Sequence, residues 1–347
     1  MLWQRSPLRE LRRTAFLTYT RPVATVERIE LAYNNVYLVR DGGSLVALDT
    51  GPDYRGAREI ISTALDGRRP ELVIATHGHL DHAGLGSWWQ ERGSPVLLSS
   101  KDLPYARGTD FEFEALASYV RASGAPQDAE ADTLEGLRVR QRWHDHLREA
   151  EGWAAASRDR RWPTQLRYVP FEPELLLHGE RRDIDGLEVL AMPGHTAGNL
   201  VAYHSGEGWL FSGDQLLPEI TPTPAIQFHH DSEGPIKRFL SLPRFFDSLA
   251  KLQALDFTRC FPGHGEPFDD VSEVIRLNLE QAEQRSERVR EALLAIGEGT
   301  VYALAETLYP RALRRRFWQI IATVQGHLDV LNERGHAAFA DGVWRAT

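Results

Sequence analysis

The chain has 347 residues, of which 42% are hydrophobic and 26% are charged, with a formal net charge of -9 at pH 7. This acidic composition argues against a generally basic nucleic-acid surface, and the length indicates one large domain with a smaller appendage. The single cysteine, Cys260, excludes an intramolecular disulfide and is expected to pack in the core, and without a signal-peptide or membrane-spanning run we expect a soluble, cytoplasmic protein.

The first hundred residues alternate between strand-like and helix-like segments. Apolar patterning predicts strands within 15–50, at 72–76 and at 95–99, and helices at 55–66 and 84–92. This order of strand, helix and strand predicts an α/β layered core.

A cluster of metal-ligand side chains follows one of these strands. Residues 76–84 read Thr-His-Gly-His-Leu-Asp-His-Ala-Gly. His77 and His79 are two positions apart, so in an extended segment they point the same way and can hold one ion. We expect Asp81 and His82 to turn toward a second ion. Crowded imidazoles and a carboxylate need a cation for solvation, and these donors suit zinc first and also admit manganese or iron.

Residues 102–168 interrupt the alternation with helical patterns rich in Glu, Arg, Ala and Trp. We predict an inserted, mainly helical region that is either a lid beside the metal loop or a dimerisation and packing element. His144-Asp145-His146 imitates the first cluster, but in a predicted helix positions two apart face different directions. It is therefore predicted to be solvated surface.

The β-rich pattern returns from residue 174, and three glycine-flanked loops there hold further candidate ligands. The strands are predicted at 187–192, 200–203 and 208–211, and the loops at 193–199, 211–214 and 261–265. Two ions are not fully coordinated by the first cluster alone, so ligands must come from elsewhere. Loops at strand ends bring such distant side chains together.

Beyond about residue 272 the chain is predicted to be helical to roughly 334 and to close with a hairpin around Asp341-Gly342. We predict a catalytic domain at 1–271 and a small winged-helix-like domain at 272–347. The latter also contains the basic stretch Arg311, Arg314, Arg315 and Arg316. This stretch either contacts a nucleic-acid backbone or, as we favour, is a charged helix face beside an aromatic anchor.

Taken together, these motifs resemble the metallo-β-lactamase fold superfamily over roughly residues 15–275. The matching motifs, in the family's order, are Asp49-Thr50-Gly51, the cluster from His77 to His82, the His195 loop, Gly213-Asp214 and Gly263-His264-Gly265. The resemblance implies an α/β (α+β) fold, a four-layer αββα sandwich with its site along one edge of the sheets. It also implies one metal held by His77, His79 and His195, a second held by Asp81, His82 and His264, and Asp214 bridging both.

The residue types at particular motif positions indicate a branch of the superfamily. His79 stands where flavodiiron proteins are expected to have Glu, and the cysteine ligand of some β-lactamases is absent. The segments 213–218 and 220–222 are similar to the branch with a C-terminal winged-helix extension. That branch includes uncharacterised hydrolases and a mitochondrial single-stranded-RNA endoribonuclease. The insertion at 102–168 is longer than we expect for it.

This resemblance implies a hydrolase with two divalent ions, zinc first, that lower the pKa of a shared water and use the bridging hydroxide as nucleophile. We predict Asp81 and Asp214 as catalytic residues through ligation, with Asp81 also able to shuttle a proton. The predicted substrate is a small ester, thioester or lactone. The alternatives are a single-stranded-RNA endoribonuclease and a catalytically silent binding module. We expect a small-molecule partner, with RNA the alternative, no membrane partner, and a homodimer as an open possibility.

Five further residues are given supporting roles. Asp49 is predicted to orient a ligand histidine rather than to bind metal. Thr196 and Asn199 either stabilise their loop, which we favour, or hydrogen-bond near the site. His229 and His230 either line the substrate pocket or have no functional role.

Overall fold

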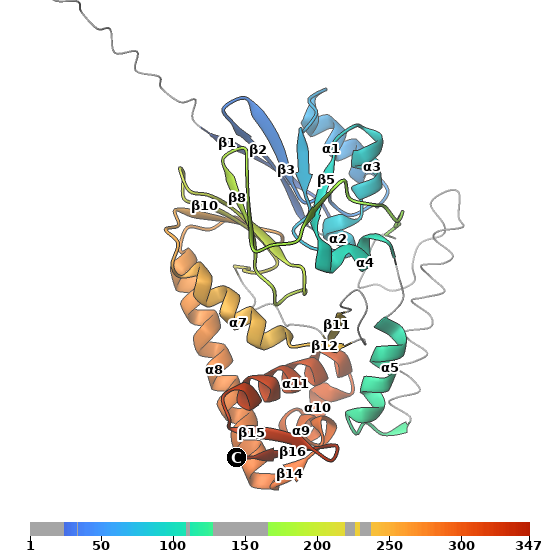
Figure 1. Cartoon of the computed structure of the whole chain (residues 1–347), viewed down its shortest axis with the longest axis vertical. Coiled ribbons are helices and arrows are strands. Elements are labelled where there is room, and N and C mark those ends of the chain that lie inside the picture. The colour runs from blue at the N-terminus through green and yellow to red at the C-terminus, as the bar shows by residue number, and fades with distance from the viewer. Residues whose placement is uncertain (1–23, 33, 109–111, 128–165, 219–225, 230–236) are drawn as a thin grey trace, which may run out of the picture.

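Two β-sheets stacked face to face form the centre of the molecule, with helices on their outer faces and a helical module at the C-terminal end (Figure 1). The structure is a computed structural model that describes residues 24–32, 34–108, 112–127, 166–218, 226–229 and 237–347. The predictions for His144-Asp145-His146, for His230 and for most of 102–168 lie outside these residues.

The first sheet takes six strands in chain order. They are β1 (Thr25–Glu30), β2 (Asn35–Asp41), β3 (Ser44–Leu48), β4 (Leu72–Ile74), β5 (Val96–Ser99) and β6 (Leu175–Leu177). The pairs from β1 to β3 are antiparallel and those from β3 to β6 are parallel. Because parallel strands end at the same edge of a sheet, the segments that follow β3, β4 and β5 meet there.

The second sheet has the order β13-β10-β9-β8-β7. Its strands are β7 (Arg181–Ile184), β8 (Leu187–Ala191), β9 (Leu200–His204), β10 (Trp209–Gly213) and β13 (Arg259–Pro262). Strands β10 and β13 are parallel, so their following loops also share an edge. A separate hairpin pairs β11 (Gln227–His229) with β12 (Lys237–Phe239).

Side chains that alternate along the strands divide the core into layers. Tyr37 and Val39 of β2 belong to the cluster between the sheets, whereas Leu38 belongs to the cluster under the first sheet's helices. Those helices are α1 (Ala57–Leu65), α2 (Leu80–Ala83) and α3 (Gly86–Glu91). The period of two along a strand produces this division.

Helices α7 (Ser241–Leu252) and α8 (Val271–Ile296) cover the second sheet. The buried residues Leu242, Phe245 and Leu249 of α7 are three or four positions apart, which gives the helix one apolar stripe against the sheet. With α1 and α3 on the other side, the order is helix, sheet, sheet, helix. The predicted αββα layering is confirmed. Cys260 is fully buried in β13 and is confirmed as a packing residue.

The C-terminal module has its own core, to which α8 contributes its second half. Its other elements are α9 (Val301–Leu308), α10 (Pro310–Leu313), α11 (Phe317–Glu333) and a sheet of β14 (Glu298–Gly299), β16 (Val343–Ala346) and β15 (Ala337–Ala340). The turn between β15 and β16 is Asp341-Gly342, both at positive φ, so the predicted hairpin is confirmed. Among the described helices, none is long and apolar enough to cross a membrane.

The start of the predicted insertion divides between the two ends of the molecule. Its described elements are the 3-10 turn η1 (Ser100–Asp102), α4 (Leu103–Ala106) and α5 (Glu112–Ala122). Helix α4 lies by the first sheet, and α5 lies beside the C-terminal module (Figure 1). The Tyr119 hydroxyl of α5 donates to Gln325 Oε1 on α11 at 3.0 Å. This part of the insertion therefore packs on the C-terminal module.

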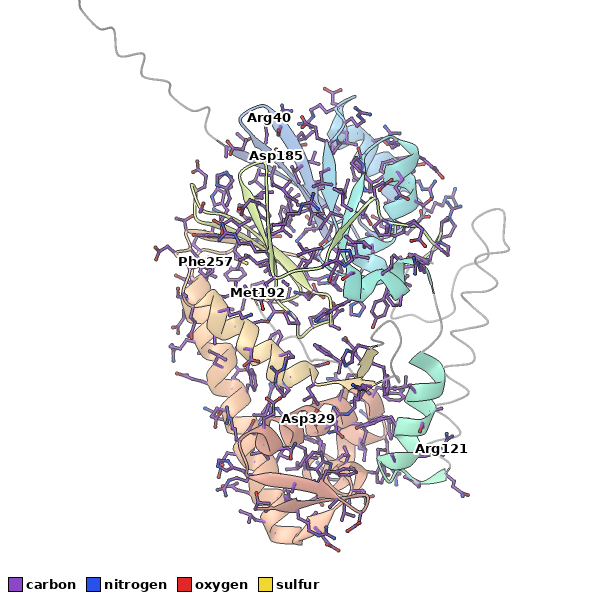
Figure 2. The ribbon with its side chains drawn as sticks, viewed as in Figure 1. Arg40, Arg121, Asp185, Met192, Phe257 and Asp329 are labelled. Atoms are coloured by element: carbon purple, nitrogen blue, oxygen red, sulfur yellow. The ribbon has the colours of Figure 1, made fainter. Side chains whose placement is uncertain are left out.

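A buried ion pair joins that module to the β11–β12 hairpin. Arg238 of β12 donates to both carboxylate oxygens of Asp329 on α11, at 2.5 and 2.6 Å, and Gln325 adds a third hydrogen bond at 2.7 Å. Asp329 is labelled in Figure 2, and its side chain is 4% exposed.

We expect Asp329→Ala to lower the free energy of unfolding by about 3 kcal/mol, because Arg238 is then left largely buried without its partner. Chemical denaturation measures the change. Asp247→Ala, which removes an exposed partner of Arg244, is the control and should cost less than about 1 kcal/mol. Equal losses in the two variants would contradict this account of the pair.

Candidate metal centre

Seven side chains from four strand-end segments meet where the two sheet edges come together. His77, His79, Asp81 and His82 follow β4, His195 follows β8, Asp214 follows β10 and His264 follows β13. We call these seven residues the ligand cluster. The structure brings together every residue that the sequence analysis named as a metal ligand.

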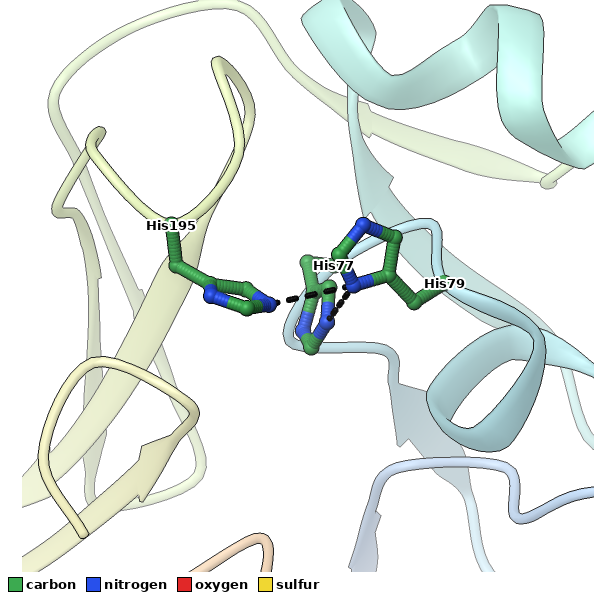
Figure 3. A group of neighbouring side chains, drawn as sticks. All are labelled: His77, His79 and His195. Atoms are coloured by element: carbon green, nitrogen blue, oxygen red, sulfur yellow. Dashed lines mark hydrogen bonds between the residues drawn. The ribbon is translucent and has the colours of Figure 1, made fainter. Parts of the chain in front are cut away.

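Three imidazoles form the first group of this cluster (Figure 3). His79 Nδ1 lies 3.0 Å from His77 Nε2 and 3.0 Å from His195 Nε2. The His77 side chain is fully buried, while His79 and His195 are half-buried. One face of the group is therefore sealed and the other is open to a ligand.

Asp81, His82 and His264 form the second group. Asp81 Oδ2 lies 3.4 Å from His264 Nε2 and 3.7 Å from His82 Nε2. Asp214 lies between the two groups. Its Oδ1 is 3.3 Å from both His82 Nε2 and His264 Nε2, and its Oδ2 is 3.4 Å from His195 Nε2. This is the position expected of a bridging carboxylate.

Gly263 allows this close approach. A Cβ atom at Gly263 would lie 2.6 Å from His82 Cε1 and 2.8 Å from Asp214 Oδ1. Both distances are shorter than side chains tolerate, so only glycine fits between the two ligands.

The chemistry of the donors fits divalent cations. A neutral imidazole nitrogen offers one hydrogen or one lone pair, so His79 Nδ1 cannot pair fully with two neighbouring nitrogens. Asp214 Oδ1 and Oδ2 lie 3.3 to 3.4 Å from the Nε2 atoms of His82, His264 and His195. A cation accepts lone pairs from the ring nitrogens that face one another in the cluster and from the carboxylates, which offsets the cost of crowding them together.

Asp49 supports the second group from behind. It follows β3, and its Oδ2 lies 2.7 Å from His82 Nδ1. Its Oδ1 accepts hydrogen bonds from the backbone N–H and the hydroxyl of Thr76, each at 2.8 Å. These contacts hold the His82 ring so that Nε2 faces Asp214, and they confirm the predicted orienting role of Asp49.

The two groups differ in the protonation of their histidines. Burial lowers the pKa of His195 to about 3, and burial together with the neighbouring histidines lowers the pKa of His77 well below its usual value. Burial also acts to lower the pKa of His264 and His82. Hydrogen bonds to Asp214 and Asp81 outweigh it and raise the pKa of His264 to about 9, and Asp49 and Asp214 raise that of His82.

We therefore expect cations to bind the second group in competition with protons. At pH 7 His82 and His264 hold protons in the metal-free protein, so binding should release about two protons and strengthen as the pH rises toward about 9. Because the raised pKa of His264 stabilises the metal-free fold fully below pH 6.5, that stabilisation is lost as the pH rises through about 9. Calorimetry in buffers of different ionisation enthalpy counts the protons, and release of none would contradict the assignment.

The sequence analysis named three further residues near the site: Thr196 and Asn199 in the loop after β8, and His229 in β11. Thr196 donates to Asp102 Oδ2 at 2.7 Å, and Asn199 donates to the Met192 carbonyl at 3.2 Å. The Asn199 bond stabilises the loop, as the sequence analysis favoured, whereas the Thr196 bond joins the loop to Asp102 of η1 beside the first group. His229 lies in β11, half-buried with its ring 6.0 Å from that of Phe239, and is outside the ligand cluster.

The sequence analysis missed two residues beside the first group. Asp102 is fully buried and accepts hydrogen bonds from the segments of Gly78 and His195. Tyr105 packs against Gly78, where a Cβ atom would lie 2.5 Å from Tyr105 Cβ. The available signal was position, because Asp102 follows β5 as Asp49 follows β3, and both strands run parallel to β4.

Comparisons with known proteins agree with this geometry. Residues 30–264 match the family described as the Metallo-beta-lactamase superfamily. The chain is 28% identical over 309 residues to "Probable metallo-hydrolase YqjP" of Bacillus subtilis (strain 168), covering 85% of this chain and 86% of that protein. It is 28% identical over 197 residues to "Acyl-coenzyme A thioesterase MBLAC2" of Homo sapiens, covering 52% of this chain and 57% of that protein.

A solved structure shows the same fold. The metallo-beta-lactamase family protein TTHA1429 from Thermus thermophilus aligns with a TM-score of 0.66 at 22% identity. The alignment covers 93% of this chain and 98% of that chain, so the common fold includes the C-terminal module as well as the two sheets.

Proposed function

Because this chain belongs to the metallo-beta-lactamase superfamily, we propose that its ligand cluster holds two divalent metal ions and that it hydrolyses an acyl bond in a small substrate. The family match and the metallo-hydrolase relatives make the chain a metal-dependent hydrolase. The observation on which the dinuclear proposal rests is the position of Asp214, between two groups that each offer three further donors. Zinc is the proposed metal, with manganese and iron as alternatives.

Each part of the cluster has a different task. Two divalent ions held by the ligand cluster would lower the pKa of a water molecule and polarise the acyl oxygen of the substrate. His77, His82 and Asp214 are buried and hold the closed side of the centre, whereas His79, Asp81 and His264 are half-buried and face the side from which a substrate enters. We propose that Asp81 also carries the proton from the attacking water to the leaving group; burial acts to raise the pKa of its carboxyl, but His82 and His264 outweigh burial and lower this pKa to about 2, so Asp81 holds the proton only in passing. Water oxygen then bonds to the acyl carbon, the bond to the leaving group breaks, and an acid and an alcohol or thiol are the products.

A thioester is the substrate that we propose to test first. The human relative is named as an acyl-coenzyme A thioesterase, and the superfamily domain is the part of the chain that both proteins are expected to share. A thiolate is a good leaving group, so the hydrolysis of a thioester makes small demands on proton donation. Esters and lactones require the same attack on an acyl carbon and remain candidates.

The alternative, cleavage of single-stranded RNA, is favoured by one feature of the C-terminal module. A cavity of about 460 Å³ is lined by Pro310, Arg311, Arg314 and Arg315. These arginines are exposed, and no carboxylate in the described part of the chain forms an ion pair with them. Unpaired arginines attract phosphates, and RNA offers a series of them.

The deciding experiment compares substrates on one preparation. The full-length chain, stripped of metal and reloaded with Zn²⁺, Mn²⁺ or Fe²⁺, is assayed on acetyl and longer acyl-coenzyme A, aryl esters, lactones and a single-stranded RNA. The proposal expects metal-dependent release of free thiol, alcohol or hydroxy acid without RNA cleavage. Metal-dependent RNA cleavage with no acyl hydrolysis would establish the alternative, and wild-type rates after complete metal removal would contradict both.

A further inference from the structure

The buried carboxylate of Asp102 connects the two segments that supply all three histidines of the first group. Asp102 ends η1, directly after β5, and its side chain is fully buried. Its Oδ2 accepts hydrogen bonds from the Gly78 backbone N–H at 2.9 Å and from the Thr196 hydroxyl at 2.7 Å. Its Oδ1 accepts the Gly198 backbone N–H at 2.7 Å.

The groups that donate these hydrogen bonds lie next to the three histidines in the sequence. Gly78 lies between His77 and His79, and Thr196 directly follows His195. The two segments belong to different sheets and are more than a hundred residues apart in the chain. One backbone hydrogen bond, from the Leu200 N–H to the Thr76 carbonyl at 2.7 Å, joins them. The Asp102 carboxylate adds three further hydrogen bonds beside the histidines, so it helps to set the separation of the first group's ring nitrogens.

The surrounding structure is shaped to this carboxylate. A Cβ atom at Gly198 would lie 2.4 Å from Asp102 Oδ1 and 2.6 Å from Asp102 Cγ. Gly198 does not have a positive φ, so its backbone conformation admits alanine, and the contact with the Asp102 side chain and with its backbone nitrogen, at 2.8 Å, excludes a side chain. Removing the Asp102 carboxylate would take away the acceptor of the buried Gly78 and Gly198 N–H groups, and a buried N–H group without an acceptor destabilises the fold.

We infer that Asp102 is a positioning residue for the first metal ion: it acts on His77, His79 and His195 through the backbone that carries them, by hydrogen bonds to Gly78, Thr196 and Gly198. The inference rests on the proposed function, because it assigns that group to a metal. It concerns the binding of one ion and leaves the second group, which Asp49 supports, outside its effect. Loss of a hydrogen-bond partner behind metal ligands lowers metal affinity by about 10- to 100-fold.

The test is a Zn²⁺ titration of the metal-free, full-length chain against a competing chelator. Wild type should show two binding steps, and the step lost in His195→Ala identifies the first ion. Asp102→Asn presents an N–H group to at least one backbone N–H, so we expect it to weaken that step about 10- to 100-fold and to leave the other step near the wild-type value. Gly198→Ala, whose added methyl group meets both the carboxylate and the backbone nitrogen of Asp102, should displace this residue and weaken the same step.

Two variants separate positioning from general stability. Asp53→Asn changes an equally buried carboxylate, which accepts hydrogen bonds from Arg58 and Arg167 and touches neither histidine segment. It should lower the melting temperature but leave both steps unchanged. Thr196→Val removes one of the three hydrogen bonds with little change in volume, and should weaken the first step less than Asp102→Asn.

Each outcome has one interpretation. Wild-type affinity for the first ion in Asp102→Asn, or in Gly198→Ala and Thr196→Val if Asp102→Asn does not fold, would overturn the positioning role while leaving the metal centre intact. A parallel loss in Asp53→Asn would overturn it as well. A wild-type chain that binds no zinc would instead remove the proposed function itself.

Discussion

Asp214→Ala is expected to reduce kcat/KM on the best acyl substrate by about a thousandfold or more. Losing a hydrogen-bond partner behind a single ligand costs about 10- to 100-fold in metal affinity or activity, and Asp214 lies against ligands of both groups. Its removal also leaves His82 with only Asp49 and Asp81, and His264 with only Asp81, to offset their positive charge. Steady-state rates and the metal content of the same sample measure the two effects together.

The control for this variant is Asp41→Ala. Asp41 is a buried carboxylate 3.3 Å from His204 Nε2, at the end of β2 opposite Asn35 and about 20 Å along the strand from the site. Asp41→Ala should lose stability and retain both metals and activity. An Asp214→Ala protein with wild-type rates on every substrate would end the assignment of Asp214 to the reaction.

Asp49→Asn has the second large expected effect. The Asp49 backbone has a φ of 65°, which asparagine adopts readily, so the substitution leaves the backbone unstrained. An amide at this position meets the Thr76 donors with its oxygen and places its NH₂ group against His82 Nδ1. The His82 proton must then move to Nε2, the nitrogen that faces Asp214 and His264.

We expect this change of tautomer to weaken the second zinc step by about 10- to 100-fold and to lower the rate of hydrolysis by at least as much. The same zinc titration measures it, with Asp41→Asn as the matched aspartate–histidine pair outside the site. Should Asp49→Asn bind both ions with wild-type affinities, Asp49 would be a fold residue without influence on the metal centre.

The ligand cluster could be predicted because its signals are local. The motif from His77 to His82 is contiguous, and His195, Asp214 and His264 each follow an apolar strand in a glycine-flanked loop. Asp49 gave the same signal, and the structure places its carboxylate against His82 Nδ1. The Asp341-Gly342 turn could also be predicted, because its two residues favour the positive φ that a two-residue hairpin turn requires.

Asp102 could not be predicted in the same way. Its partners Gly78 and Thr196 lie 24 and 94 residues away, and no pattern around Asp102 shows that β5 runs parallel to β4. A local pattern is also a poor guide to the domain boundary that we predicted between residues 271 and 272. Helix α8 begins there, but Val271 and Ile275 pack on the second sheet while Val289 and Leu293 belong to the C-terminal core. A local pattern gives the start of a helix and not the two cores that it joins.

Elemental analysis of the purified 347-residue chain, expressed in a medium that contains zinc, manganese and iron, measures whether the ligand cluster holds two metal ions. We expect two divalent ions per wild-type chain. A folded wild-type chain that still contains no divalent metal after exposure to each of these ions would contradict it.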